Sequence, residues 1–266
     1  MRTRRTRQGL AVPVSTLILV STFTLLTLFT YYFAMSSVNT QSRTVNYQTS
    51  KQEMLTLDQS ILSVARSPGT TLLQSFESHG QRFRIKPDER RMIINVTFGD
   101  RAETVYNSSN GCIEYELSSS DLVESSPFLN GDDRLIVDKN YYGMSQLFVT
   151  SGVNGREIYL GYRPIVTSYI ETDLNQTSIL RIYLVNMNSS QSLELQDNFR
   201  VKISSTDTIC QIRSIVSSSP ITDVSVIATI GEVSEEVNLP SSTVLDSTII
   251  RIETVIFNVM LVEVDD

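Results

Sequence analysis

The chain opens with one long apolar stretch. Leu10 to Met35 read LAVPVSTLILVSTFTLLTLFTYYFAM, and no charged side chain occurs between Arg7 and Arg43. At ~1.5 Å per residue, a helix from Ala11 to Ala34 is roughly 36 Å long, enough to cross a hydrocarbon core of ~30 Å with some tilt. The pattern predicts a transmembrane helix over residues 10–35, with membrane lipid as its first partner.

The pattern then changes twice. Ser36 to Glu53 holds only scattered apolar residues and neither Gly nor Pro, so it forms either a solvated helical stalk or a flexible linker. From Met54 apolar residues recur at spacings of three and four, which predicts an amphipathic helix with one face to bury. Ser67-Pro68-Gly69 ends this helix, because proline disfavours the helical conformation of the preceding residue. Its apolar positions are Met54, Leu57, Ile61 and Val64, with Leu55, Leu62 and Ala65 beside them.

After Gly69 the apolar residues follow a period of two, which indicates β-strands. Turn dipeptides such as Asn110-Gly111, Asn130-Gly131 and Asn154-Gly155 separate short strands, a spacing typical of a sandwich. The expected strands are Phe83–Ile85, Met92–Phe98, Ala102–Tyr106, Cys112–Leu117, Arg134–Val137, Gln146–Thr150, Glu157–Val166, Ile179–Met187, Phe199–Ser204, Ile209–Ile215, Asp223–Ile230, Glu235–Leu239 and Thr248–Val264.

The predicted fold class is therefore α+β. A basic leader (1–9) precedes the transmembrane helix (10–35), the stalk and amphipathic helix (36–68) and an antiparallel, sandwich-like β region (69–266). A soft boundary near Ser151 to Gly155 leaves open two modules, 70–150 and 151–266. One continuous β region is preferred, because the first module is small for an independent sandwich.

Charge sets the expected orientation. Four arginines precede the apolar stretch, so the positive-inside rule predicts a cytoplasmic N-terminus and a single-pass protein with an extracellular C-terminal domain. Without those arginines, 18 basic side chains stand against 29 acidic ones, a formal charge of about −11. That sign argues against nucleic acid as a partner, since its binding relies on Lys and Arg. The arginines are Arg2, Arg4, Arg5 and Arg7.

The leader has three interpretations. The first is an uncleaved signal anchor. The second is a secretory signal cut after Ala34-Met35-Ser36, a small-x-small pattern, although signal h-regions usually run ~7–15 residues. The third follows from the junction Arg7-Gln8-Gly9, directly before the apolar helix. This junction resembles the class III signal peptide of archaeal type IV pilins and archaellins.

The resemblance implies that a prepilin peptidase cuts between Gly9 and Leu10 on the cytoplasmic side. It also implies that the helix stays on the mature protein, as an anchor or as the core of a filament, and that the source is archaeal. Two features depart from the family. The bacterial members carry a glutamate five residues after the cut, where this chain has Val14, and Ser36 to Glu53 is polar for a dry filament core.

Within the apolar stretch the hydroxyl residues are numerous. Their side chains can bond back to the preceding helical turn, which lipid tolerates, or can join helices through small polar contacts. Self-association through this helix therefore stands beside an unpartnered span. Tyr31, Tyr32 and Phe33 suit the outer membrane interface. The hydroxyl residues are Ser15, Thr16, Ser21, Thr22, Thr24, Thr27 and Thr30.

Two modifications fit an exported chain. Cys112 and Cys210 are the only cysteines, and they form either a disulfide or two buried thiols. Four N-glycosylation sequons begin at Asn95, Asn107, Asn175 and Asn188. The alternative for each asparagine is ordinary turn or strand polarity.

No catalytic pattern emerges, and neither a cofactor nor a metal is expected. His79 stands in a polar turn without a local acid or nucleophile. Asn130, Asp132, Asp133 and Asp138 match no EF-hand spacing and are expected to form turns. Lys86 to Arg91 is expected to be a solvated charged turn.

The sequence thus favours a pilin-like membrane protein, as a subunit or minor component of a surface appendage. The alternative is a single-pass surface protein whose β region binds an envelope partner or adheres without polymerising. An exported enzyme is disfavoured.

Overall fold

The computed structural model describes residues 11–99, 101–117, 127–138, 143–152, 155–171, 177–217, 223–239 and 249–264, without the side chains of 11–13 and 78–80. The chain divides into two compact units, Met1–Asn46 and Tyr47–Asp266. One helix, α1 (Ala11–Ala65), runs through the described part of the first unit and opens the second. The stalk is therefore helical, which decides between the two alternatives for Ser36 to Glu53.

In the first unit, α1 presents its apolar side chains to the outside. Every described side chain from Val14 to Met35 is exposed, including Leu17, Phe23 and Phe29 at about 70%. A folded soluble domain normally buries such residues. The predicted apolar helix is confirmed. Its exposed apolar surface requires an apolar environment.

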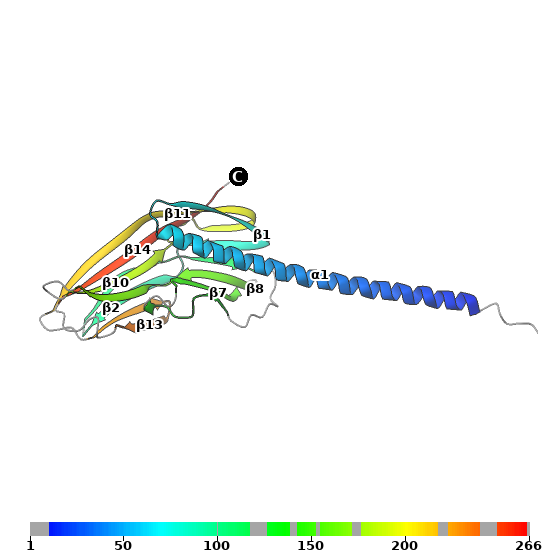
Figure 1. The fold of residues 1–266 in the computed structure, drawn as a ribbon, viewed down its shortest axis with the longest axis horizontal. Coiled ribbons are helices and arrows are strands. Elements are labelled where there is room, and N and C mark those ends of the chain that lie inside the picture. The colour runs from blue at the N-terminus through cyan, green and yellow to red at the C-terminus, as the bar shows by residue number, and fades with distance from the viewer. Residues whose placement is uncertain are drawn as a thin grey trace, which may run out of the picture. The chain divides into compact units, whose positions relative to one another are not determined.

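The second unit is built on a ten-stranded sheet, in the order β5-β7-β8-β4-β1-β11-β14-β10-β9-β6. β11 and β14 lie side by side along most of their length (Figure 1). The bounds are β1 (Thr71–Lys86), β4 (Cys112–Glu116), β5 (Phe128–Asn130), β6 (Val137–Asp138), β7 (Ser145–Gly152), β8 (Gly155–Tyr162), β9 (Ile165–Glu171), β10 (Thr177–Asn186), β11 (Leu193–Val216) and β14 (Ile249–Glu263).

A four-stranded sheet covers part of the ten-stranded one. Its order is β13-β12-β2-β3, and alternate residues such as Ile94 and Val226 pack against Leu180, Ile182 and Ile252 of the large sheet. The turn Asn110-Gly111 carries the chain from the small sheet to the large one. The bounds are β2 (Arg91–Phe98), β3 (Arg101–Ser109), β12 (Val224–Ile230) and β13 (Val233–Asn238).

The last turns of α1 cover the large sheet within the second unit (Figure 1). The amphipathic pattern predicted this face, and its four main positions are at most 1% exposed. They share one core with residues of β1, β4, β8, β11 and β14. The helix stops at Ala65, just before Ser67-Pro68-Gly69, as expected. The four positions are Met54, Leu57, Ile61 and Val64.

The expectation of an antiparallel β region is wrong for two pairs. β10 runs parallel to β14, with ten residue pairs from Thr177↔Ile249 to Asn186↔Asn258, and β6 runs parallel to β9. Parallel neighbours need a long crossover connection. Between β10 and β14 the chain provides one through β11, β12 and β13, so strand alternation could not reveal the direction of β14.

Several predicted strand boundaries also change. The segments expected at Phe199–Ser204 and Ile209–Ile215 are one strand, β11, with a register shift between Ser205 and Asp207. The expected strand Glu157–Val166 divides into β8 and β9 at Arg163-Pro164, where proline lacks a donor for the ladder. His79 lies within β1 rather than in a turn, where the register with β11 shifts between Glu77 and Arg82.

Strands from both sides of Ser151 to Gly155 share the same sheets. β1 pairs with β11, β2 pairs with β12, and β7 and β8 form a hairpin across this point. The residues assigned to 70–150 and 151–266 are therefore joined by backbone hydrogen bonds in both sheets.

Candidate functional site

The exposed part of α1 combines an apolar surface with internally satisfied hydroxyl groups. Thr24, Thr27 and Thr30 each donate to the carbonyl oxygen four residues earlier, at 2.8–2.9 Å. Thr22 donates to Leu19 at 3.0 Å. Such bonds let a hydroxyl lie in lipid without an unpaired polar group. By length and composition, this helix is the one candidate membrane span in the described chain.

Polar contacts fix the other end of α1 on the large sheet. The carboxylate of Glu53 accepts from the backbone N–H of Glu77 at 3.0 Å and from Tyr115 Oη at 3.3 Å. Gln74 donates to the carbonyl oxygen of Glu53 at 2.9 Å. One turn earlier, Ser50 Oγ donates to Gln81 Oε1 at 2.8 Å. These directional bonds set the register of the helix on β1, which apolar packing alone does not.

Among the acidic side chains at this contact between α1 and the large sheet, Asp58 is the most deeply buried, with 1% of its surface exposed. Its Oδ1 accepts from Tyr162 Oη at 3.0 Å, and its Oδ2 accepts from Asn130 Nδ2 at 2.8 Å. Burial raises the pKa of Asp58, and the hydrogen bonds from Ser145, Asn130 and Tyr162 act in the opposite direction. A carboxyl at the centre of the contact between helix and sheet makes that contact sensitive to protonation.

This leads to a prediction for Asp58→Asn. Because the folded state holds the Asp58 proton more tightly than the unfolded chain, its contribution to the free energy of unfolding is complete below the unfolded pKa of ~3.9. It is lost as the pH rises through the raised folded pKa. The variant cannot ionise, so urea unfolding of the full chain in detergent should lose this part of the pH dependence.

Asp133→Asn is the matched control, because Asp133 is exposed in the neighbouring loop. Its pH profile should follow that of the original chain. An Asp58→Asn profile that keeps the original slope would show that this carboxyl is not the titrating group.

A second buried charge lies beside this network. Arg163 is completely buried and donates through Nη1 to Asp132 Oδ1 and to the Arg134 carbonyl oxygen, and through Nε to Gly143. Burial alone would raise the pKa of Asp132, but the guanidinium groups of Arg163 and Arg134 outweigh it and hold this pKa below its usual range. The pairing keeps the loop after β5 folded over the end of β8.

The four side chains that were considered as cation ligands either contact protein groups or are exposed. Asn130 binds Asp58, Asp132 binds two arginines, and Asp133 and Asp138 are exposed. The expectation that they form turns holds for Asp132 and Asp133, which lie between β5 and β6, whereas Asn130 and Asp138 lie in those strands.

A different group brings Glu89, Cys112 and Glu114 within ligand distance of one another. Burial raises the pKa of the Cys112 thiol to about 11, which keeps it protonated. Lys86 Nζ lies 3.1 Å from Glu89 and 2.9 Å from Glu114. The single ammonium group of Lys86 therefore already pairs with both carboxylates of this group.

The turn from Lys86 to Arg91 is not simply solvated, contrary to expectation. Arg90 has a left-handed backbone (φ 61°), and its guanidinium lies 5.9 Å from the ring centre of Tyr159 and bonds Gln146. Burial lowers the pKa of this arginine. Gly161 leaves the room that the guanidinium occupies, since a Cβ there would fall 1.5 Å from Nη1.

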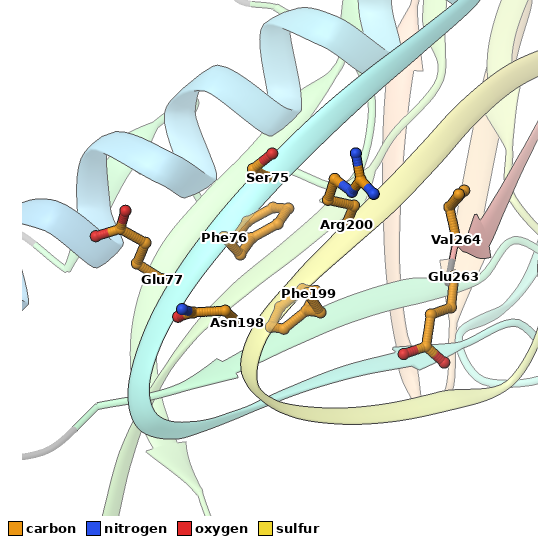
Figure 2. Close-up of a pocket in the computed structure, with 8 residues that line it drawn as sticks. All are labelled: Ser75, Phe76, Glu77, Asn198, Phe199, Arg200, Glu263 and Val264. Atoms are coloured by element: carbon orange, nitrogen blue, oxygen red, sulfur yellow. The ribbon is translucent and has the colours of Figure 1, made fainter. Parts of the chain in front are cut away.

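A shallow hollow of ≈ 450 Å³ opens between β1, β11 and the end of β14. Figure 2 shows Phe76 and Phe199 beside each other within it, and their rings stack at 4.9 Å. Ser75, Glu77, Asn198, Arg200, Glu263 and Val264 complete its lining. Both aromatic rings belong to the core under α1, so the hollow borders that core.

Of the two alternatives for Cys112 and Cys210, a disulfide or two buried thiols, neither describes both residues in this structure. Both thiols are free, with Cys112 buried and Cys210 exposed. Cys112 is level with Lys86 at one end of β1, whereas Cys210 lies 17 residues beyond Leu193 on β11. At ~3.3 Å per residue this is roughly 56 Å of strand, far beyond disulfide reach.

Three of the four sequons lie in described residues, and Asn175 lies outside them. Asn95 points away from the core of the small sheet, as its use would require, and accepts from Thr104 at 2.8 Å. Asn107 is exposed and accepts from Arg91. Asn188 donates from Nδ2 to Ser108 at 3.3 Å, so the atom that would carry a glycan is engaged.

Sequence reasoning missed Asp58 and Arg163. Asp58 follows Met54 by four residues and precedes Ile61 by three, so the helical period alone places it on the apolar face. A charge at such a position is a signal of a buried polar contact. No comparable signal marks Arg163, and the junction Gly9-Leu10 lies outside the described residues.

No family model, no curated protein and no solved structure matches the chain. Fold and contacts are thus the grounds on which a function can be argued.

Proposed function

We propose that this protein is a membrane-anchored cell-surface protein of pilin-like architecture, acting as a subunit or minor component of a surface appendage. The observation that carries the proposal is α1 itself. A single helix from Ala11 to Ala65 holds both the exposed apolar stretch and the turns buried against the large sheet. The resemblance of Arg7-Gln8-Gly9 to a class III signal peptide adds to it.

In this proposal each half of α1 has a separate task. The residues from Val14 to Met35 lie in lipid or against the same residues of other copies, and their threonines are bonded within the helix. The buried face and the contacts of Glu53 and Asp58 hold the β domain on the helix. The four arginines stay in the cytoplasm, and the β domain faces outward.

The alternative is a single-pass surface protein that does not polymerise. Its support is the stretch from Ser36 to Arg43, where helical side chains are exposed and mostly polar. Helices of a packed filament meet through dry surfaces, and a polar segment suits a solvated stalk better. In this alternative the β domain binds an envelope partner.

The N-terminal sequence of the chain, extracted from native membranes, tests the proposal. Cleavage by a prepilin peptidase is expected to give a protein that begins at Leu10. The variant Gly9→Leu should then keep the full leader, because the peptidase requires a small residue before the cut. A start at Met1 or Arg2 in the unaltered chain would rule out pilin-like processing and leave the plain anchor.

Electron microscopy of the same membranes separates the two assembly states. Filaments that contain this chain would contradict the non-polymerising alternative.

A further inference from the structure

Within the part of the chain that the structure describes, β11 carries a long edge without a neighbouring strand. Its first half pairs with β1, ending at Ser204↔Thr71, whereas β14 pairs with it as far as Val216↔Ile249. Among the described residues, Thr206 to Val216 therefore have a strand on one side only. This segment lies in the centre of the strand order, but beyond the end of β1 it is an edge.

This edge has only part of the protection that natural edges carry. Natural edges are short, bulged or charged, or they carry proline or a covering element, and here the charges are Asp207 and Arg213 and the register shift lies at the start of the edge. Here eleven residues, TDTICQIRSIV, include no proline and no lysine. Ile212 is 60% exposed and Val216 is 69% exposed. Unpaired backbone groups beside exposed β-branched side chains form a template for another strand.

The sequence of this edge is complementary to itself in one register. In an antiparallel pair related by a two-fold axis through residue 210, Asp207 of one copy lies opposite Arg213 of the other. The same register places Cys210 opposite Cys210 and Ile212 opposite Thr208. No other two-fold register places Asp207 opposite Arg213. The register that pairs these two charges is therefore the same one that pairs Cys210 with Cys210.

The side chains concerned can accept these neighbours. The period of two puts Cys210 and Ile212 on one face and Asp207 and Arg213 on the other. Arg213 uses Nη1 for its contacts with Glu103 and the Thr104 carbonyl oxygen, and a guanidinium has five N–H donors. Asp207 accepts from Asn258 at 2.8 Å, and a carboxylate accepts several such bonds.

We propose that Thr206–Val216 of β11 pairs antiparallel with the same segment of a second copy, in the register centred on Cys210. The two large sheets then form one continuous sheet across the two-fold axis. Opposed residues in an antiparallel pair have Cα atoms ~4.5–5.5 Å apart, within the range of a disulfide. This dimer does not depend on the proposed function, since it uses only the β domain.

Disulfide exchange on the purified full chain in detergent tests the pairing. Oxidised glutathione is the oxidant: one new S–S bond forms between two Cys210 residues, the S–S bond of the reagent breaks, and two glutathione thiols are released with the two protons. A band at twice the mass is expected on a non-reducing gel. Cys112→Ser should keep this band, and Cys210→Ser should lose it.

Register is tested in the Cys210→Ser background. Ile212→Cys alone should stay monomeric, because two such residues are roughly 13 Å apart along the paired strands. A mixture of Ile212→Cys and Thr208→Cys proteins should cross-link. Equal cross-linking of Ile212→Cys alone would overturn the register.

Charge reversal tests the pairing independently of the thiol. Asp207→Lys or Arg213→Glu should slow the Cys210 cross-link roughly fivefold, since like charges then oppose each other. The double variant should restore the rate, although it still lacks the original contacts with Asn258 and Glu103. No cross-link in the unaltered chain at any concentration, or a double variant as slow as the single ones, would overturn the proposal.

Discussion

Replacement of Phe23 and Leu26 by arginine is expected to remove the chain from the membrane. Both side chains are exposed in the middle of the apolar stretch of α1. An arginine at the centre of a span costs about 3 kcal/mol, so the pair costs about 6 kcal/mol of insertion free energy. After alkaline carbonate extraction, the original chain should stay in the membrane pellet, and the variant should appear in the supernatant or be degraded.

Val38→Arg combined with Val45→Arg is the matched control. These two residues are also exposed, at 58% and 55%, and lie on the same helix beyond Met35. Because their part of the helix is expected outside the hydrocarbon core, this variant should remain in the pellet. Release of the unaltered chain without detergent would contradict membrane insertion altogether.

Leu57→Ala is expected to destabilise the contact between α1 and the large sheet strongly. Leu57 is completely buried in the core that α1 shares with the large sheet. Removal of three carbon atoms from such a site leaves a cavity, and the free energy of unfolding should fall by roughly 2–5 kcal/mol. The chain has no Trp, so near-ultraviolet circular dichroism of its tyrosines during urea unfolding in detergent measures the change.

Gln59→Ala provides the comparison on the same helix. Gln59 is exposed, and its truncation should change stability by less than about 0.5 kcal/mol. If Leu57→Ala changed the free energy of unfolding as little as Gln59→Ala, the helix would not pack on the sheet as it does in the structure.

The helical half of the fold could be predicted because its signals are local. An apolar stretch without charge fixes the exposed part of α1, and the spacing of Met54, Leu57 and Ile61 fixes the buried face. Pro68 marks the end. Each feature is set by residues within a few turns of one another, so periodicity is sufficient.

The β half was predictable as strands but not as a sheet. Alternation locates β2 or β10, yet it carries no information on which strand lies beside which. The parallel pairing of β10 with β14 and the wide separation of the two cysteines both follow from that order. The free edge of β11 is also a consequence of order, because it exists only where β1 ends and β14 continues.

The candidate contacts divide in the same way. Asp58 carried a readable signal, since the helical period places a charge on an apolar face. Arg163 and Arg90 carried no such signal, because their partners are brought near them only by the folded sheet. The partner of Arg163 is Asp132, and the partners of Arg90 are Tyr159 and Gln146.

The position of β14 has a consequence for how the protein is made. This strand lies between β11 and β10, so a segment that is translated after all the other described strands occupies the interior of the large sheet. Until residues 249–263 arrive, two long strands have no common neighbour and expose their backbone groups. In the proposed function the β domain crosses the membrane, and it would then have to stay unfinished, and protected from premature pairing, until β14 has crossed as well.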